Sequence, residues 1–159
     1  MGESREVPAA IRIVTHWAGS YTPTAELTPR ESRYRVFDSG RKGQRVLEVS
    51  LTAIEATRNR LGQAAERVRW SVGDITSVDL PPNAYDVWHD CAAFHFLKRV
   101  EHCAAYLRQV AKTIRSGGHV LVSTFGPEGP TKCSGLEVVR YDEGSLHAEF
   151  GRGSSRSKA

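Results

Sequence analysis

The feature that most constrains the fold is the order of strand-like and helix-like segments between residues 45 and 125. Short apolar runs predict strands at 45–49, 68–73, 85–89 and 119–125. Between them, apolar residues recur at helical spacing in the segments 51–61 and 100–115. The order strand, helix, strand, strand, helix, strand is typical of an α/β sandwich with a mainly parallel sheet. We therefore predict this fold class, with the four strands parallel to one another.

Local signals predict where the two helices begin and end. Ser50 immediately precedes the first helical segment, and serine is a preferred residue at helix N-caps. Gly62 follows that segment, and Gly117 and Gly118 follow the second one. Glycine is the usual residue just beyond the end of a helix, so these positions are expected to terminate both helices.

Two strand-like runs before the first helix lie too close together in the chain to be parallel neighbours. The run 34–38 ends in Asp38 and leads into a link that contains Gly40 and Gly43. Only residues 39–44 separate it from the run 45–49, whereas a parallel crossover needs about a dozen residues or more. Either the two runs pair antiparallel, or one of them is not a strand.

The length of 159 residues suits one domain with its own hydrophobic core. We expect a loosely structured N-terminal arm over residues 1–33, because prolines interrupt its second half. The folded domain is predicted to span residues 34–150. Glycine, serine and basic residues fill the last segment, 151–159, so it is predicted to be a disordered basic tail.

The composition indicates a cellular compartment and argues against some classes of partner. Three cysteines at wide spacings fit neither a disulfide framework nor a zinc site, so we expect reduced thiols, no metal and a cytoplasmic location. No apolar stretch is long enough to span a bilayer, and the first residues lack the apolar region of a secretory leader, so no membrane partner is expected. The net charge of +4 is too modest to indicate a nucleic-acid partner.

The residues that directly follow the predicted strands are the first place to look for a ligand site. In open α/β sheets, ligands bind outside the carboxyl ends of the strands. The segments found there are Asp38 to Gly40, Glu48, Gly73 to Ile75, His89-Asp90 and Thr124 to Gly126. A carboxylate at such a position can accept hydrogen bonds from ribose hydroxyls or from an adenine amino group. The pattern therefore favours a nucleoside-like cofactor.

Several segments between residues 45 and 142 stand out by their order and spacing. Four of them are Val46-Leu-Glu-Val-Ser50, Val72-Gly-Asp-Ile-Thr76, Leu80-Pro-Pro-Asn-Ala-Tyr-Asp-Val87 and Ile114-Arg-Ser-Gly-Gly-His-Val-Leu-Val122. Two more specific segments are Trp88-His-Asp-Cys-Ala-Ala-Phe-His-Phe-Leu97 and Cys133-Ser-Gly-Leu-Glu-Val-Val-Arg-Tyr-Asp142. Together they resemble the class I S-adenosylmethionine-dependent methyltransferases, and the two more specific segments resemble a subgroup of small bacterial-type members. The resemblance implies a Rossmann-like sandwich and methyl transfer from S-adenosyl-L-methionine.

The resemblance also implies roles for individual residues. Asp74 follows Glu48 by 26 residues, which is similar to the family's spacing between its ribose-binding acid and the acid near adenine. Glu48 is therefore expected to bind the ribose, Asp74 to lie on the adenine side, and Ile75 to pack on the ring. The family's glycine-rich loop would correspond to Asp38, Gly40 and Gly43, in a degraded form with Lys42 at a position where the family prefers glycine.

His89 and Asp90 are the candidates for chemistry on the acceptor side, because they follow the strand near which the family places the transferred methyl group. Positioning alone often suffices for methyl transfer, so neither residue is assigned a proton. The resemblance leaves the acceptor open, and we expect a small molecule or a protein rather than a nucleic acid.

The chain departs from the family at both ends of the domain. The helix that normally follows the glycine-rich loop has no room, and the antiparallel strand pair that closes the family's sheet has no candidate after residue 125. The expected fold is thus a truncated class I methyltransferase core. A catalytically inactive remnant that serves as a binding module, or a defective isoform, is the alternative to an active enzyme.

Each candidate also has a structural interpretation. Asp74 can cap the turn that follows it. Trp88, Phe94 and Phe96 are expected in the core, and His95 is expected to be a hydrogen-bonded structural residue. A nicotinamide-dependent oxidoreductase would need an intact G-x-G-x-x-G turn, which the sequence lacks. A nucleic-acid-binding module would need a recognition motif, and we find none.

Overall fold

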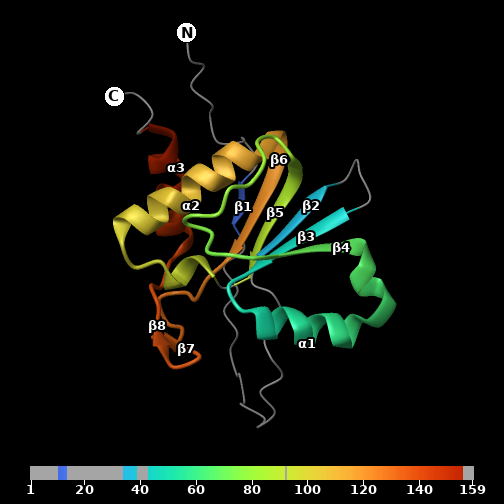
Figure 1. The fold of residues 1–159 in the computed structure, drawn as a ribbon. Coiled ribbons are helices and arrows are strands. Elements are labelled where there is room, and N and C mark those ends of the chain that lie inside the picture. The colour runs from blue at the N-terminus through green and yellow to red at the C-terminus, as the bar shows by residue number, and fades with distance from the viewer. Residues whose placement is uncertain (1–10, 14–33, 39–42, 92, 156–159) are drawn as a thin grey trace.

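The computed structural model describes residues 11–13, 34–38, 43–91 and 93–155, and Figure 1 shows their arrangement. A six-stranded sheet has the order β1-β6-β5-β2-β3-β4. Its strands are β1 (Ile11–Ile13), β2 (Tyr34–Asp38), β3 (Gly43–Glu48), β4 (Val68–Val72), β5 (Tyr85–Cys91) and β6 (Ile114–Ser123). The predicted α/β fold is confirmed, and each of the four predicted strands is present.

One strand of the sheet runs against all the others. β3 and β4 are parallel, β5 and β6 are parallel, and β1 is parallel to β6. β2 lies between β3 and β5 and is antiparallel to both. The first of the two alternatives for the closely spaced runs is therefore correct, since a short link can close an antiparallel hairpin but not a parallel crossover.

The helices begin close to their predicted positions. α1 covers Leu51–Leu61, and the Ser50 hydroxyl oxygen accepts a hydrogen bond from the Ala53 amide at 3.3 Å. Gly62 ends α1 with a positive φ of 55°, which glycine adopts without steric cost. A short 3₁₀ helix, Gly62–Arg67, follows. α2 covers Val100–Thr113, two residues shorter than predicted, because Ile114 already belongs to β6.

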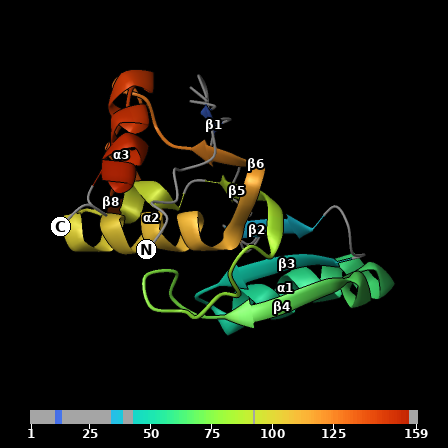
Figure 2. The same cartoon turned by 90° about the horizontal axis from the view of Figure 1, so that it is seen from above.

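The helices form layers on the sheet (Figure 2). α1 contacts β3, whereas α2 contacts β6 and α3 (Glu143–Ser155) contacts β1 and α2. Consecutive strand residues point to opposite faces of a sheet. Val46 and Leu47 of β3 are both buried, so both faces of β3 are covered, but only Leu47 belongs to the main core cluster.

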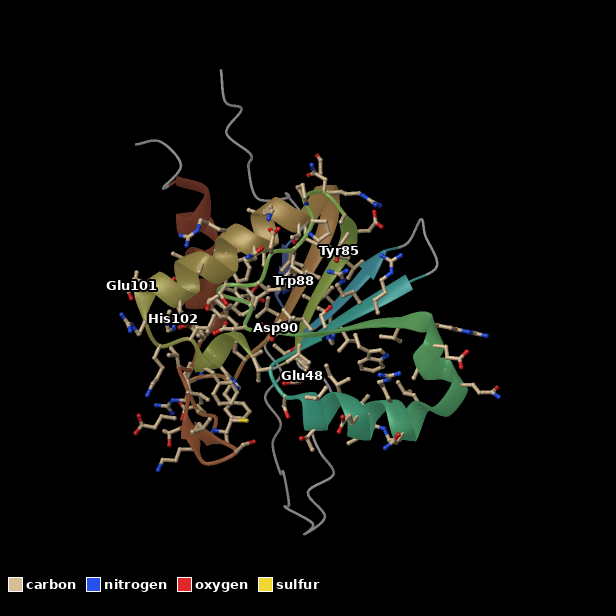
Figure 3. The ribbon with its side chains drawn as sticks, viewed as in Figure 1. Glu48, Tyr85, Trp88, Asp90, Glu101 and His102 are labelled. Atoms are coloured by element: carbon tan, nitrogen blue, oxygen red, sulfur yellow. The ribbon has the colours of Figure 1, made fainter. Side chains whose placement is uncertain are left out.

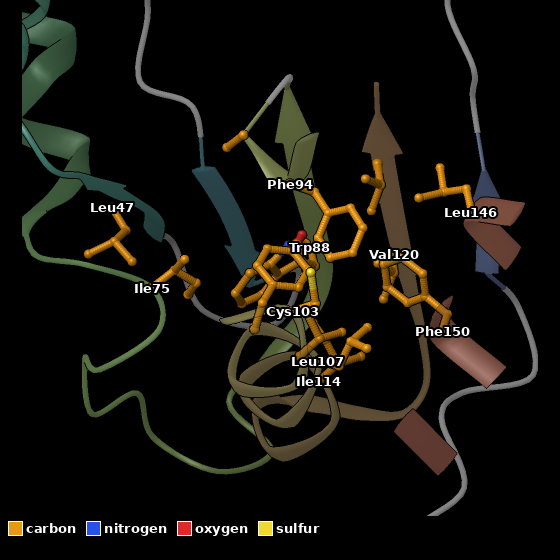
Figure 4. Close-up of a cluster of buried hydrophobic side chains, with 14 of the residues drawn as sticks. Leu47, Ile75, Trp88, Phe94, Cys103, Leu107, Ile114, Val120, Leu146 and Phe150 are labelled. Carbon is orange, nitrogen blue, oxygen red and sulfur yellow. Dashed lines mark hydrogen bonds between the residues drawn. The ribbon is translucent and has the colours of Figure 1, made fainter. Parts of the chain in front are cut away.

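The main core lies between the sheet and helices α2 and α3 (Figure 4). Trp88 of β5 and Phe94 pack against Tyr106 of α2, with ring centroids 5.6 and 4.9 Å away. Phe150 of α3 lies on Phe94 at a centroid separation of 5.7 Å. Trp88 and Phe94 are fully buried, which confirms the core interpretation for these two rings, while Phe96 is only half-buried.

The C-terminal part differs from expectation. α3 continues to Ser155, so the described residues of the predicted disordered tail, 151–155, are helical. A small hairpin of β7 (Lys132–Cys133) and β8 (Leu136–Glu137) precedes α3 but does not join the main sheet. The outer position beside β6 is taken instead by β1, from the predicted N-terminal arm. Among the described helices, none is long and apolar enough to cross a membrane.

Gly118 in β6 is predicted to tolerate no side chain. A Cβ there would lie 2.6 Å from Cγ2 of Ile114 and 2.9 Å from the Asp86 carbonyl oxygen of the neighbouring strand. Gly118→Ala should therefore lower the free energy of unfolding by about 1–3 kcal/mol through overpacking. Gly126→Ala is the matched control, since a Cβ at Gly126 meets no atom within 4 Å. Urea denaturation of both variants measures the difference, and equal stabilities would contradict the prediction.

Candidate functional site

Two acidic residues, Glu48 and Asp74, lie at the carboxyl edge of the sheet. Glu48 ends β3, and Asp74 comes two residues after the end of the parallel neighbour β4. The register pairs Glu48 with Val72, and the Gly73 amide donates to the Glu48 carbonyl at 3.0 Å. The parallel pairing therefore brings together the two residues that the sequence assigned to the ribose and adenine ends of a cofactor.

Glu48 is held firmly at its strand end. Its residue is 5% exposed, and its Oε1 accepts a hydrogen bond from the Val49 amide at 2.9 Å. Figure 3 shows Glu48 at the same edge of the sheet as Asp90. Because water screens interactions at such a buried site only weakly, a hydrogen bond donated to this carboxylate is stronger than one at the open surface.

Asp74 also organises the turn that carries it. Its Oδ1 accepts hydrogen bonds from the amide and the hydroxyl of Thr76, both at 2.8 Å. These two hydrogen bonds, the one from the amide more than the one from the hydroxyl, lower the pKa of Asp74 from its ordinary value of 3.8. The predicted turn-capping role is thus present. The side chain remains exposed and ionised at neutral pH, so it is also available to a ligand.

The apolar side chains beside these carboxylates are not the ones expected. Ile75, predicted to pack on an adenine ring, is 2% exposed and belongs to the core cluster. Val49 and Val72 flank Glu48 instead, and they are 63% and 53% exposed. The sequence signal for them is an apolar residue directly after the strand-end acid and another at the end of the next strand.

Two of the residues assigned to the degraded glycine loop, Asp38 and Gly43, lie at the other edge of the sheet. Asp38 pairs with Gly43, whereas Tyr34, at the opposite end of β2, pairs with Leu47 beside Glu48. β3 spans roughly 16 Å from Gly43 to Glu48 at about 3.3 Å per residue. The prediction that Asp38 and Gly43 share one cofactor site with Glu48 is therefore corrected, because the reversed direction of β2 carries them away. Gly40 lies outside the described residues.

His89 and Asp90 do not act as a pair. They are consecutive in β5, so their side chains point to opposite faces of the sheet. His89 is half-buried, while Asp90 is 0% exposed and faces the main core. The placement of these residues offers no shared substrate-side site, which corrects the expectation that both serve the acceptor.

Asp90 has a structural role that the sequence did not reveal. Its Oδ1 accepts from the Ala93 amide at 2.8 Å, and its Oδ2 accepts from the Phe94 amide at 3.0 Å. The Tyr106 hydroxyl donates to Oδ2 at 2.8 Å and accepts from the Trp88 indole nitrogen at 2.9 Å. This buried network fixes the chain that leaves β5 against helix α2.

The donor and acceptor set at the carboxyl edge fits the adenosine half of S-adenosylmethionine. Ionised carboxylates only accept hydrogen bonds, and ribose hydroxyls and the adenine amino group are donors. The exposed side chains of Val49 and Val72 offer apolar surface for a purine ring. The methionine half finds no glycine loop at this edge among the described residues, because Asp38 and Gly43 lie at the opposite edge.

Comparisons with known proteins agree with this reading of the fold. A family model described as a methyltransferase domain matches residues 37–122, which is more than half of the chain. No curated protein matches the sequence at a significant level.

Among solved structures, the YcgJ protein of Bacillus subtilis is similar, with a TM-score of 0.55 at 19% identity over 69% of this chain and 50% of its own. An S-adenosylmethionine-dependent methyltransferase from Mesorhizobium loti gives a TM-score of 0.56 at 17% identity over 69% of this chain and 61% of its own. The chain thus spans only about half to three fifths of the length of these structures. The expected cofactor, S-adenosylmethionine, is supported by the family match. By its matched domain and its fold, the chain belongs to the methyltransferase-domain family.

Proposed function

We propose that this chain is an S-adenosylmethionine-dependent methyltransferase domain that acts on a small-molecule or protein acceptor. The observation that carries the proposal is the placement of Glu48 and Asp74 at the ends of adjacent parallel strands. Two acceptors at one sheet edge, with exposed Val49 and Val72 beside them, suit an adenosine group. The family match supports methyl transfer as the reaction.

The chain's residues would bind and orient the cofactor. Glu48 would accept hydrogen bonds from the ribose hydroxyls, and Asp74 would accept from the adenine amino group. The apolar surfaces of Val49 and Val72 would pack against the purine. When bound, S-adenosylmethionine supplies an electrophilic methyl group on its sulfonium centre. The remaining task of the protein is to hold an acceptor atom in line with that group. Such positioning alone can remove a large share of the activation barrier for methyl transfer.

No proton transfer is assigned to Asp90, because its carboxylate already accepts three hydrogen bonds in the core. An acceptor that must lose a proton needs a base within hydrogen-bond reach of the substrate. An acceptor with a free lone pair, such as a thiolate or a neutral amine, needs only positioning.

The test is calorimetric titration of the purified chain with S-adenosylhomocysteine, the product that remains after the methyl group has left. We expect saturable binding at one site and a melting temperature that rises with ligand concentration, because the ligand binds only the folded chain. A chain that melts cooperatively but shows neither heat nor a shift would contradict the proposal. That result would favour the inactive remnant as the alternative.

Asp74 gives this site a predicted pH signature in stability. Its folded pKa lies below the ordinary value of 3.8, so its contribution to stability is present above that value and is lost as the pH falls through the folded pKa. The advantage of the parent chain over Asp74→Asn should be small, about 0.5 kcal/mol after solvent screening, and should vanish in acid. Urea denaturation at neutral pH and near pH 3 checks this. An advantage that grows in acid would contradict it.

A further inference from the structure

The direction of β2 decides what stands at the centre of the carboxyl edge. Along this edge, the described ends follow in the order Asp74, Glu48, Tyr34 and Asp90. Tyr34 is the first residue of β2, and it pairs with Leu47 on one side and with Asp90 on the other. The centre of this edge is therefore formed by the start of β2, and not by a turn that follows the end of a parallel strand.

A ligand that extends beyond Glu48 toward β5 approaches Asp90, whose side chain is fully buried and already has partners. Asp90 lies in that direction and accepts from two amides and the Tyr106 hydroxyl. A buried carboxylate committed in this way has little capacity left for an ammonium group. Asp38 and Gly43 lie at the opposite edge, with the length of β3 between them and Glu48.

By contrast, the part of the edge formed by the ends of β3 and β4 has side chains that suit a nucleoside. Glu48 ends β3 and Asp74 follows the end of β4, and the Gly73 amide donates to the Glu48 carbonyl between these two strands. Val49 and Val72 expose apolar surface beside them. All four belong to β3, β4 or the residues that directly follow them. Among the residues that the structure describes, the features that suit a ligand are thus concentrated at the β3–β4 side of the edge.

From this asymmetry we infer that the site recognises adenosine as such and gains little affinity from the methionine part of the cofactor. The inference rests on the proposed function and specifies which half of S-adenosylmethionine the chain binds. Its ligands form a class: S-adenosylmethionine, S-adenosylhomocysteine, 5′-methylthioadenosine and adenosine bind with similar dissociation constants. A site with a working glycine loop would instead bind the two amino-acid conjugates far more tightly.

The experiment titrates the full chain with S-adenosylhomocysteine, 5′-methylthioadenosine and adenosine under one set of conditions. We expect the three dissociation constants to agree within about tenfold, a difference of less than one decade in affinity. Asp38→Asn should leave all three unchanged, because Asp38 ends β2 at the far edge. Asp74→Asn makes the same chemical change at the near edge, and it should weaken all three by a similar factor.

The outcomes separate the two proposals. If S-adenosylhomocysteine binds more than about tenfold tighter than both nucleosides, the inference is overturned while the proposed function stands. Weaker binding of S-adenosylhomocysteine to Asp38→Asn, with unchanged adenosine binding, would overturn it as well. If none of the three ligands binds to a cooperatively folded chain, the proposed function and the inference both fall.

Discussion

Asp90→Ala should lower the free energy of unfolding by about 3–5 kcal/mol, because removal of this buried carboxylate leaves three hydrogen-bond donors without their acceptor. The substitution leaves the Ala93 and Phe94 amides without their acceptor, and the Tyr106 hydroxyl loses the group it donates to. Each buried donor left unsatisfied costs about 1–3 kcal/mol. Since small domains are stable by only about 5–15 kcal/mol, urea denaturation should show a large shift.

Asp86→Ala is the matched control for this change, because Asp86 lies on the same strand but is half-buried. Its carboxylate bonds to the Arg115 guanidinium at 3.0 Å near the surface, and loss of such a pair should cost about 1 kcal/mol or less. Tyr106→Phe should fall between the two, since it removes one hydroxyl from the network. If Asp90→Ala costs no more than Asp86→Ala, the network does not hold the end of β5.

The parts of this fold that follow from short-range signals were predictable. α1 begins after Ser50 and ends at Gly62 because a serine hydroxyl and a glycine with positive φ act within one turn of the residues that they cap. The strands at β3 to β6 follow from short apolar runs, whose burial on both sides requires helices on both faces. The link of six residues likewise limited β2 to an antiparallel pairing or to no strand at all.

Other features depend on contacts between distant segments, and local pattern could not supply them. The sequence places His89 and Asp90 together at a strand end, but only the packing of α2 decides which of them faces the core. α3 reaches Ser155 although glycine and serine fill its end, and Leu146 and Phe150 anchor this helix in the core. The sequence showed the glycine motif that follows β2, but not the direction in which β2 runs. That direction is set by pairing with the neighbouring strands β3 and β5.

Glu48→Gln should weaken the binding of S-adenosylhomocysteine by about 10- to 100-fold. The change keeps the size of the side chain but removes its charge, and hydrogen bonds to a charged group contribute about 1.5–3 kcal/mol. That range converts to one to two decades in the dissociation constant. Calorimetric titration of the parent and the variant measures the ratio. Melting temperatures of both must first show that each is folded, because Glu48 is itself buried.

Glu55→Gln provides the control for the loss of one negative charge near the same strands. Glu55 lies on α1, seven residues after Glu48 in the sequence, and is exposed, so its replacement alters the net charge without changing a residue at the strand ends. Long-range attraction would affect both variants alike, whereas direct hydrogen bonding affects only Glu48→Gln. Equal affinities of Glu48→Gln and Glu55→Gln, in folded chains, would place the adenosine somewhere other than the β3–β4 edge. A tenfold or greater difference between two variants that melt like the parent would support direct contact between the ligand and Glu48.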